Sequence, residues 1–181
     1  MNQPFVHLRV HSEYSLSDGI VRIKPLVAAT AEMGSPAVAV TDRNNLFALI
    51  KFYNAAHDAG VKPIVGCDVL IEPEGDESAS TLVLLARDDA GYRSLCEVLS
   101  RGYLEGQHDH VPVLQRSWLE EHATGLIALS AAAEGDVGRA LAAGRVEQAQ
   151  ARLRAWMDLF PDRYYLELHR TGRPGGERLL H

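Results

Sequence analysis

Runs that favour β-strands alternate with runs that favour helices along almost the whole chain. Apolar and β-branched runs predict strands at 5–10, 37–41, 62–65, 69–72, 82–86, 126–129 and 164–168. Amphipathic runs with helix start or stop signals predict helices at 25–33, 47–59, 91–104, 137–143 and 146–160. This rhythm is typical of parallel strands joined by right-handed crossovers, and therefore of an α/β domain.

Three further segments carry weaker signals. Ser117 and Glu120 have the spacing of a capping box and predict a short helix. The segment 106–112 is polar and poorly patterned, and the acidic segment 73–80 is expected to be a solvated loop. Gly175 and Gly176 precede the last residues, which resemble the start of a helix, so we expect the chain to stop within a domain.

Composition narrows the class of protein. With 46% hydrophobic and 23% charged residues over 181 positions, the chain can bury a core, and global disorder is excluded. Its net charge of −6 is opposite in sign to that of a freely acting nucleic-acid-binding protein, so contact with DNA would need a local patch or another part of a larger protein.

The expected compartment is the cytoplasm. The amino terminus lacks a basic region followed by an apolar stretch, which disfavours a signal peptide. No apolar run approaches the roughly 18 residues of a membrane helix. Cys67 and Cys96 lie far apart in the sequence and are expected to be reduced, buried side chains.

The first predicted strand has a polar face. Because strand side chains alternate between faces, Phe5, His7, Arg9 and His11 share one side. A sheet covered by helices on both faces would be apolar on both sides. A polar face therefore predicts a barrel with a polar mouth.

The carboxyl ends of the other strands agree with this prediction, because each apolar run is followed by polar residues. These polar groups are at 41–44, 66–68, 87–89, 130 and 169–171. In α/β barrels the carboxyl ends of the strands form the active-site face.

Several of these residues have alternative interpretations. His7 and His11 are either hydrogen-bonded structural histidines or metal ligands, and Asp42 either caps the helix near Leu46 or belongs to the site. His108 and His110 have ligand-like spacing, but they lie in a loop and are expected to form a solvated turn.

Six segments of the chain, taken together, resemble one family. They are 5–19 (FVHLRVHSEYSLSDG), 39–47 (AVTDRNNLF), 61–66 (VKPIVG), 84–92 (LLARDDAGY), 125–130 (GLIALS) and 166–174 (LELHRTGRP). In this order they are similar to the PHP (polymerase and histidinol phosphatase) domain at the amino terminus of bacterial replicative DNA polymerase III alpha subunits. The resemblance implies a distorted β/α barrel over 1–181 whose carboxyl-terminal part, like the polymerase domains after it, lies beyond residue 181.

The resemblance also implies where metal ligands would stand. Metal-binding members have a His-x-His motif, an Asp-His pair, an acidic residue after Gly-x, and later His, Cys, His and Asp-x-His positions, the last of which would fall beyond residue 181. The positions that keep ligand chemistry here are His11, Asp42 and Asp68. The positions that are substituted here are Arg9, Arg43, Thr81, Ala132 and Thr171.

The two arginines argue against a metal centre. Arginine is always protonated and offers only hydrogen-bond donors, so it cannot be a ligand. A guanidinium about 4 Å from a divalent ion would repel it by roughly 8 kcal/mol at an effective dielectric of about 20. We therefore expect no bound metal and no catalytic residue, and we predict that Arg9 and Arg43 pair with Asp42 and Asp68.

The function that the resemblance implies is that of a larger enzyme. The full-length protein would extend a DNA primer with deoxynucleotides, using Mg²⁺ held in a polymerase domain outside this chain. This region itself would need no cofactor and would act as an inactive scaffold. Its expected partners are the proofreading exonuclease subunit and other holoenzyme subunits, with DNA bound through the full-length protein and no membrane involved.

Two other functions remain open from sequence. One is an independent metal-dependent PHP phosphoesterase or 3′–5′ exonuclease, which the histidine-rich start favours and the substituted ligand positions oppose. The other is an α/β binding module unrelated to replication, which only the ordered motifs oppose.

Overall fold

The computed structural model describes residues 5–73, 75 and 77–169 of the 181-residue chain. It divides into two compact units, Met1–Asp68 and Val69–His181. None of the described helices is both long and apolar enough to cross a membrane.

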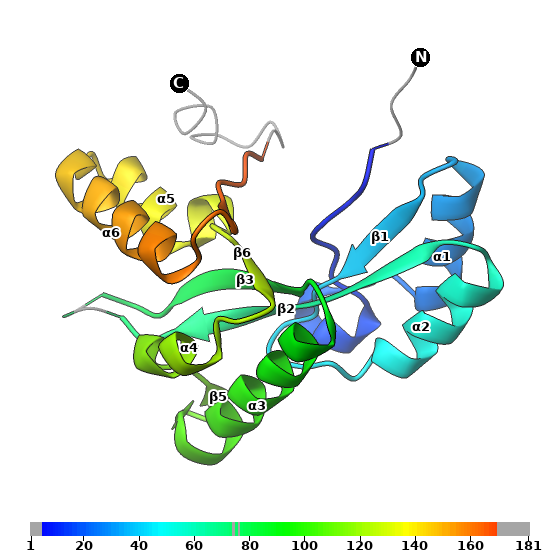
Figure 1. The fold of residues 1–181 in the computed structure, drawn as a ribbon, viewed down its shortest axis with the longest axis horizontal. Coiled ribbons are helices and arrows are strands. Elements are labelled where there is room, and N and C mark those ends of the chain that lie inside the picture. Colours follow the sequence, from blue (N-terminus) through cyan, green and yellow to red (C-terminus); the bar gives the residue numbers. More distant parts are fainter. Residues whose placement is uncertain (1–4, 74, 76, 170–181) are drawn as a thin grey trace. The chain divides into compact units, whose positions relative to one another are not determined.

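The first unit is built around one parallel strand pair (Figure 1). Its elements are η1 (Glu13–Asp18), α1 (Ile23–Glu32), β1 (Ala37–Val40), α2 (Leu49–Asp58) and β2 (Lys62–Ile71), whose last residues belong to the second unit. Strand β1 pairs with 62–65 of β2 in parallel. Helices α1 and α2 pack against each other, and α1 also packs against β1.

The segment before η1 runs beside β1 without forming a regular strand. It has one parallel bridge, between His7 and Val38, and two backbone hydrogen bonds, from Ala39 N to His7 O (2.8 Å) and from Thr41 N to Val10 O (2.9 Å). The predicted strand at 5–10 is therefore an extended segment that contacts β1 at a few points. These contacts are enough to fix which side chains share a face.

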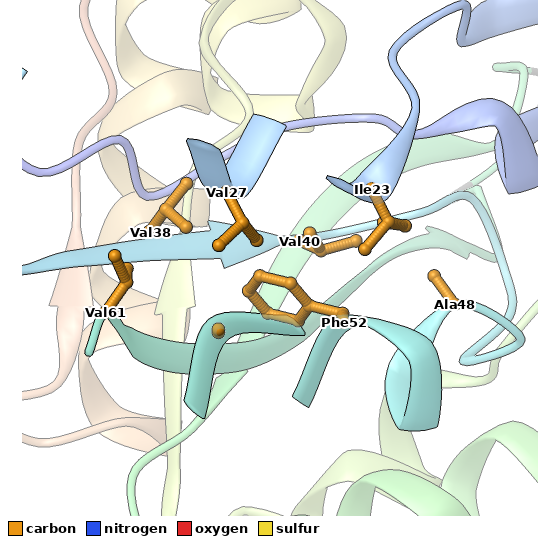
Figure 2. Packing of buried hydrophobic residues seen from close by; sticks show 8 residues of the cluster. Ile23, Val27, Val38, Val40, Ala48, Phe52 and Val61 are labelled. Carbon is orange, nitrogen blue, oxygen red and sulfur yellow. The ribbon is translucent and has the colours of Figure 1, made fainter. Parts of the chain in front are cut away.

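The core of the first unit forms where the apolar faces of α1 and α2 meet β1. Figure 2 shows the ring of Phe52 pointing toward Val27 and Val40, with Val38 and Val61 also in the cluster. All five side chains are buried. Helix α1 is followed by Gly34, which has φ +67°. This left-handed conformation is unfavourable for residues with a Cβ, so glycine is preferred there.

The second unit is a mixed sheet with helices. Its remaining elements are β3 (Ser80–Ala86), α3 (Asp89–Glu105), β4 (Gln107–His108), β5 (Val111–Pro112), α4 (Arg116–His122), β6 (Leu126–Leu129), η2 (Ala132–Glu134), α5 (Asp136–Ala142), α6 (Val146–Leu159) and β7 (Tyr164–Tyr165). Within this unit the strand order is β3-β6-β7. Helices α5 and α6 lie side by side (Figure 1).

The expectation of a parallel sheet is wrong for one strand pair. Strand β3 pairs with β6 in the antiparallel direction, whereas β6 and β7 are parallel. Between β3 and β6 the chain forms helix α3, the β4–β5 hairpin and helix α4. The connection is therefore not the single crossover helix that joins two parallel strands. The architecture remains mixed α/β.

Three local predictions also need correction. The strands predicted at 62–65 and 69–72 are one continuous strand, β2, which runs through Gly66 without a break and ends at Ile71. Helix α4 begins after Gln115 and has no side-chain cap, so Ser117 does not form the capping box. The segment 106–112 contains the two-residue strands β4 and β5, joined through Asp109 and His110 at φ +50° and +66°.

We predict that Phe52→Ala lowers the free energy of unfolding by about 3–5 kcal/mol, because the ring fills the core between α1, α2 and β1. Urea unfolding followed by circular dichroism measures the change. Ile50→Ala is the matched control on α2; Ile50 is exposed, and its replacement should cost within about 0.5 kcal/mol. Equal losses in the two variants would contradict this assignment of the core.

Candidate functional site

The strongest polar cluster of the first unit surrounds Asp68. Arg9 places Nε 2.8 Å and Nη2 2.7 Å from Asp68 Oδ2. His11 Nε2 lies 2.7 Å from the same oxygen. The side chain of Asp68 is 1% exposed and that of Arg9 is 11% exposed. A buried carboxylate thus has a guanidinium and an imidazole on one oxygen.

Strand alternation explains how Arg9 and His11 reach the same carboxylate. They are two residues apart in the extended segment beside β1, so both side chains lie on one face. His7, two residues earlier, has its ring 4.9 Å from that of Phe5 in an edge-to-face contact. The face predicted to be polar therefore divides into an exposed aromatic end and a charged end at Asp68.

Backbone pairing places Asp68 beside the end of β1. Arg43 and Asp68 form a parallel bridge, with Asn44 N donating to Asp68 O (2.8 Å) and Asp68 N donating to Asp42 O (3.2 Å). The preceding residue, Cys67, donates its thiol to Asp42 O at 3.1 Å. Burial, together with the nearby Asp68 carboxylate, raises the pKa of this thiol well above its usual range.

Asp42 is held by neutral donors. Its Oδ1 accepts hydrogen bonds from Ser12 N (2.6 Å) and Ser15 Oγ (2.7 Å), and its Oδ2 accepts one from Ser12 Oγ (2.6 Å). All three residues are buried. Asp42 does not cap a helix, because α2 starts only at Leu49. Its carboxylate instead anchors the chain that follows His11.

Arg43 faces a different acid from those named in the sequence analysis. Its Nε lies 3.0 Å from Asp18 Oδ2, with both side chains about half exposed, and its backbone N donates to Ser15 Oγ at 3.1 Å. The pairing of Arg43 with Asp42 or Asp68 stays a prediction.

The remaining sequence candidates lie in the second unit or outside the described residues. Thr81 is buried in β3 and Ala132 is buried in η2, at φ +46°. Thr171 lies outside the described residues. His108 and His110 are exposed in the β4–β5 hairpin, as expected for a solvated turn. Cys96 is only half-buried, which corrects the expectation that both cysteines are buried.

The residues around Asp68 do not fit a divalent metal. Within 5–73, 75 and 77–169, no group of three or more His, Cys, Asp and Glu side chains is placed to hold an ion. Asp68 Oδ1 is buried and accepts no hydrogen bond from the described residues, so it is the one oxygen of the cluster open to a further contact. A divalent metal ion takes roughly four to six ligand atoms, and one free carboxylate oxygen with a nearby imidazole supplies too few. The positive charge of Arg9 would also repel the ion.

The sequence profile of the PHP domain matches residues 7–171. The chain belongs to the PHP domain family. Over 182 residues it is 52% identical to the "DNA polymerase III subunit alpha" of Pseudomonas aeruginosa, and over 184 residues it is 46% identical to the protein of that name from Escherichia coli K12. Both alignments cover 100% of this chain and 16% of the relative, so the chain spans about a sixth of the length of these proteins.

A solved structure supports the fold of this PHP domain. A Bifidobacterium adolescentis protein whose name describes a metal-dependent phosphoesterase has a TM-score of 0.60 to this chain, at 12% identity. The likeness covers 98% of this chain and 83% of that one. At this identity it shows the fold alone.

Sequence reasoning missed the serines of this PHP domain. Ser12 and Ser15 supply the three hydrogen bonds described above for the Asp42 carboxylate, and Asp18 pairs with Arg43. A signal was present, because two hydroxyl residues three positions apart follow the polar strand face directly. Its meaning depended on the position of Asp42, some 30 residues later in the chain.

We predict that Arg9→Met lowers the free energy of unfolding by about 3–5 kcal/mol at pH 7, because it leaves the Asp68 carboxylate buried without its guanidinium. Urea unfolding followed by circular dichroism measures the change.

Arg87→Met is the matched control for Arg9→Met. Arg87 pairs with Asp88 at 3.2 Å, but about half of each side chain is exposed. Such a surface pair contributes about 0–1 kcal/mol. A loss in Arg9→Met no larger than that in Arg87→Met would contradict the role of Arg9 as the partner of a buried carboxylate.

We predict that Asp42→Asn loosens the segment that Asp42 anchors. The variant replaces one acceptor oxygen by a donor and removes the charge that strengthens three hydrogen bonds, at a cost of about 1–3 kcal/mol. Hydrogen exchange at the amides of Ser12 and Ser15 should become faster. Asp18→Asn, which alters a half-exposed ion pair, should leave the amide of Ser12 unchanged.

Proposed function

We propose that the chain is the amino-terminal PHP region of a replicative DNA polymerase III alpha subunit. Relatives with that name are 41–52% identical over essentially the whole chain. The chain spans 16% of their length, and in this proposal template-directed DNA synthesis and its Mg²⁺ belong to other parts of the protein.

Within that protein we infer that this region is a scaffold without metal chemistry. The observation that carries the inference is the contact of Arg9 with Asp68, at 2.7 Å. A buried carboxylate needs a compensating positive charge. In a metal-binding PHP domain an ion would supply that charge, whereas here a side chain of the same chain supplies it, and no ion is needed to fold the cluster.

The neutral partners of Asp42 support the same inference. Both of its oxygens already accept short hydrogen bonds from Ser12 or Ser15. A metal ion would have to displace these donors, and each displaced donor would be left buried. Asp42 and Asp68, the two carboxylates at the former ligand positions, therefore both have partners within the chain: serines for Asp42 and Arg9 for Asp68.

The partners follow from the proposed parent protein. The region would help to bind the proofreading exonuclease subunit and would work with other holoenzyme subunits in the cytoplasm. DNA would be bound through the full-length protein, since the net charge of this chain is −6. The competing function is a metal-dependent PHP phosphoesterase or 3′–5′ exonuclease, for which His11 and the open Asp68 Oδ1 are the residual features.

The test uses the full-length parent protein, purified without chelator. We expect primer extension with Mg²⁺, capture of the exonuclease subunit, and no stoichiometric Zn, Mn or Fe by elemental analysis of the same protein.

Three outcomes would contradict the proposal. Absence of primer extension would remove the assignment to a polymerase, and failure to capture the exonuclease subunit would remove the scaffold role. Stoichiometric metal together with chelator-sensitive hydrolysis of a phosphate ester or a DNA 3′ end would establish the competing function. Asp68→Asn is the control for the last outcome, because it should abolish any metal that Asp68 holds.

A further inference from the structure

An ionic cluster of the second unit surrounds Glu77, in the segment between β2 and β3. Glu77 Oε1 lies 2.6 Å from Arg145 Nη1, and Glu77 Oε2 lies 2.9 Å from Arg152 Nη2. Hydrogen bonds from Arg145 and Arg152 lower the pKa of the Glu77 carboxyl below its usual range. The two guanidiniums, here called the Arg145–Arg152 seat, thus hold one anionic group between them.

Arg152 is anchored independently of Glu77. Its side chain is 4% exposed, and its Nη1 donates to Asp136 O at 3.0 Å. A buried guanidinium needs an anionic partner, and Glu77 supplies that charge here. The cation therefore stays in place when the Glu77 side chain turns away, and the seat then needs another anion.

The Arg145–Arg152 seat is accessible from solvent. The side chains of Glu77 and Arg145 are 27% and 46% exposed. The backbone after Glu77 is held separately, because Arg139 Nη1 donates to Ser78 O (3.1 Å) and Ala79 O (2.8 Å). Rotation of the Glu77 side chain is therefore enough to open the seat, and the neighbouring backbone need not move.

The seat adjoins a hollow in the second unit. Glu77 and Arg152 line this hollow together with Arg116, Asp136 and Trp156. The guanidinium of Arg116 lies 4.1 Å from the centre of the Trp156 ring, and Trp156 Nε1 donates to Asp136 Oδ2 at 2.9 Å. A third guanidinium thus lies at the same hollow as Arg152.

The charge around the hollow favours an anion once Glu77 turns away. The guanidiniums that then remain at the seat and the hollow are those of Arg116, Arg145 and Arg152. The acids that remain are Glu72 and Asp136, so positive charge is in excess. Guanidiniums bind phosphate oxygens through paired hydrogen bonds, and a phosphate group offers more oxygens than a carboxylate.

We propose that the Arg145–Arg152 seat binds a phosphate group and that Glu77 competes for it as a built-in carboxylate. The phosphate group takes the place of the Glu77 carboxylate, while Arg152 stays where it is. Free phosphate and the backbone of a nucleic acid both present this group. The proposal uses only residues of the second unit, so it does not depend on the assignment to a polymerase.

The experiment measures hydrogen exchange in the full-length protein by mass spectrometry, with inorganic phosphate replacing chloride at constant ionic strength. We expect phosphate to slow exchange in peptides that contain Ser78 or Arg152. In Glu77→Gln, half of the effect should need about tenfold less phosphate, because the competing carboxylate is gone. No effect of phosphate in either protein, or the same phosphate requirement in both, would overturn the inference.

Two further variants test whether the effect belongs to the seat. Glu105→Gln is the matched control, because Glu105 is 56% exposed and pairs with Arg101 at 3.1 Å on α3; it should leave the phosphate requirement unchanged. Arg145→Met, added to Glu77→Gln, should raise the requirement about tenfold, as expected for the loss of one hydrogen bond between charged groups. An unchanged requirement in that double variant would contradict the proposal.

A short oligodeoxythymidine without a terminal phosphate distinguishes the two sources of the phosphate group. If it slows exchange in the same peptides of Glu77→Gln, and Arg145→Met removes the effect, the seat binds the backbone of single-stranded DNA. If only inorganic phosphate has this effect, the seat binds free phosphate. If neither has it, the seat binds no phosphate group and the proposal is wrong.

Discussion

A buried carboxylate must find a partner, and the first unit is arranged around two of them. Asp68 is 1% exposed and receives Arg9 and His11 on one oxygen. Burying an ionised aspartate without a cation or several hydrogen-bond donors costs more free energy than the whole folding stability of a typical domain. The extended segment before η1 therefore has to lie beside β1 in the register that brings Arg9 to Asp68.

The second carboxylate meets the same requirement without a cation. The Asp42 carboxylate accepts hydrogen bonds from the hydroxyls of Ser12 and Ser15 and from the backbone amide of Ser12, all shortly after His11 in the chain. The serine hydroxyls can rotate to point their hydrogens at the Asp42 carboxylate, so its charge is compensated without a cation. Asp68 and Asp42 both stand at metal-ligand positions in the sequence. Asp68 is stabilised by an ion pair, and Asp42 by hydrogen bonds from neutral groups.

Local patterns in the sequence predicted most elements, because those patterns depend on neighbours along the chain. The strand at 126–129 and the helices near 25–33 and 146–160 are examples, and strand alternation placed Arg9 and His11 on one face. The antiparallel pairing of β3 with β6 was not predictable, because pairing direction depends on partners that no local pattern encodes. The serines around Asp42 were missed for the same reason, since their partner lies about 30 residues away.

The continuity of β2 has a consequence for how this sequence can vary in length. Cys67 and Asp68 are successive residues of one unbroken strand, so their side chains point to opposite faces. Inserting or deleting a single residue between Lys62 and Gly66 would exchange the faces, turning the carboxylate away from Arg9 and the thiol toward it. Natural variants of this domain should therefore tolerate length changes in the loops around β2 but not inside it.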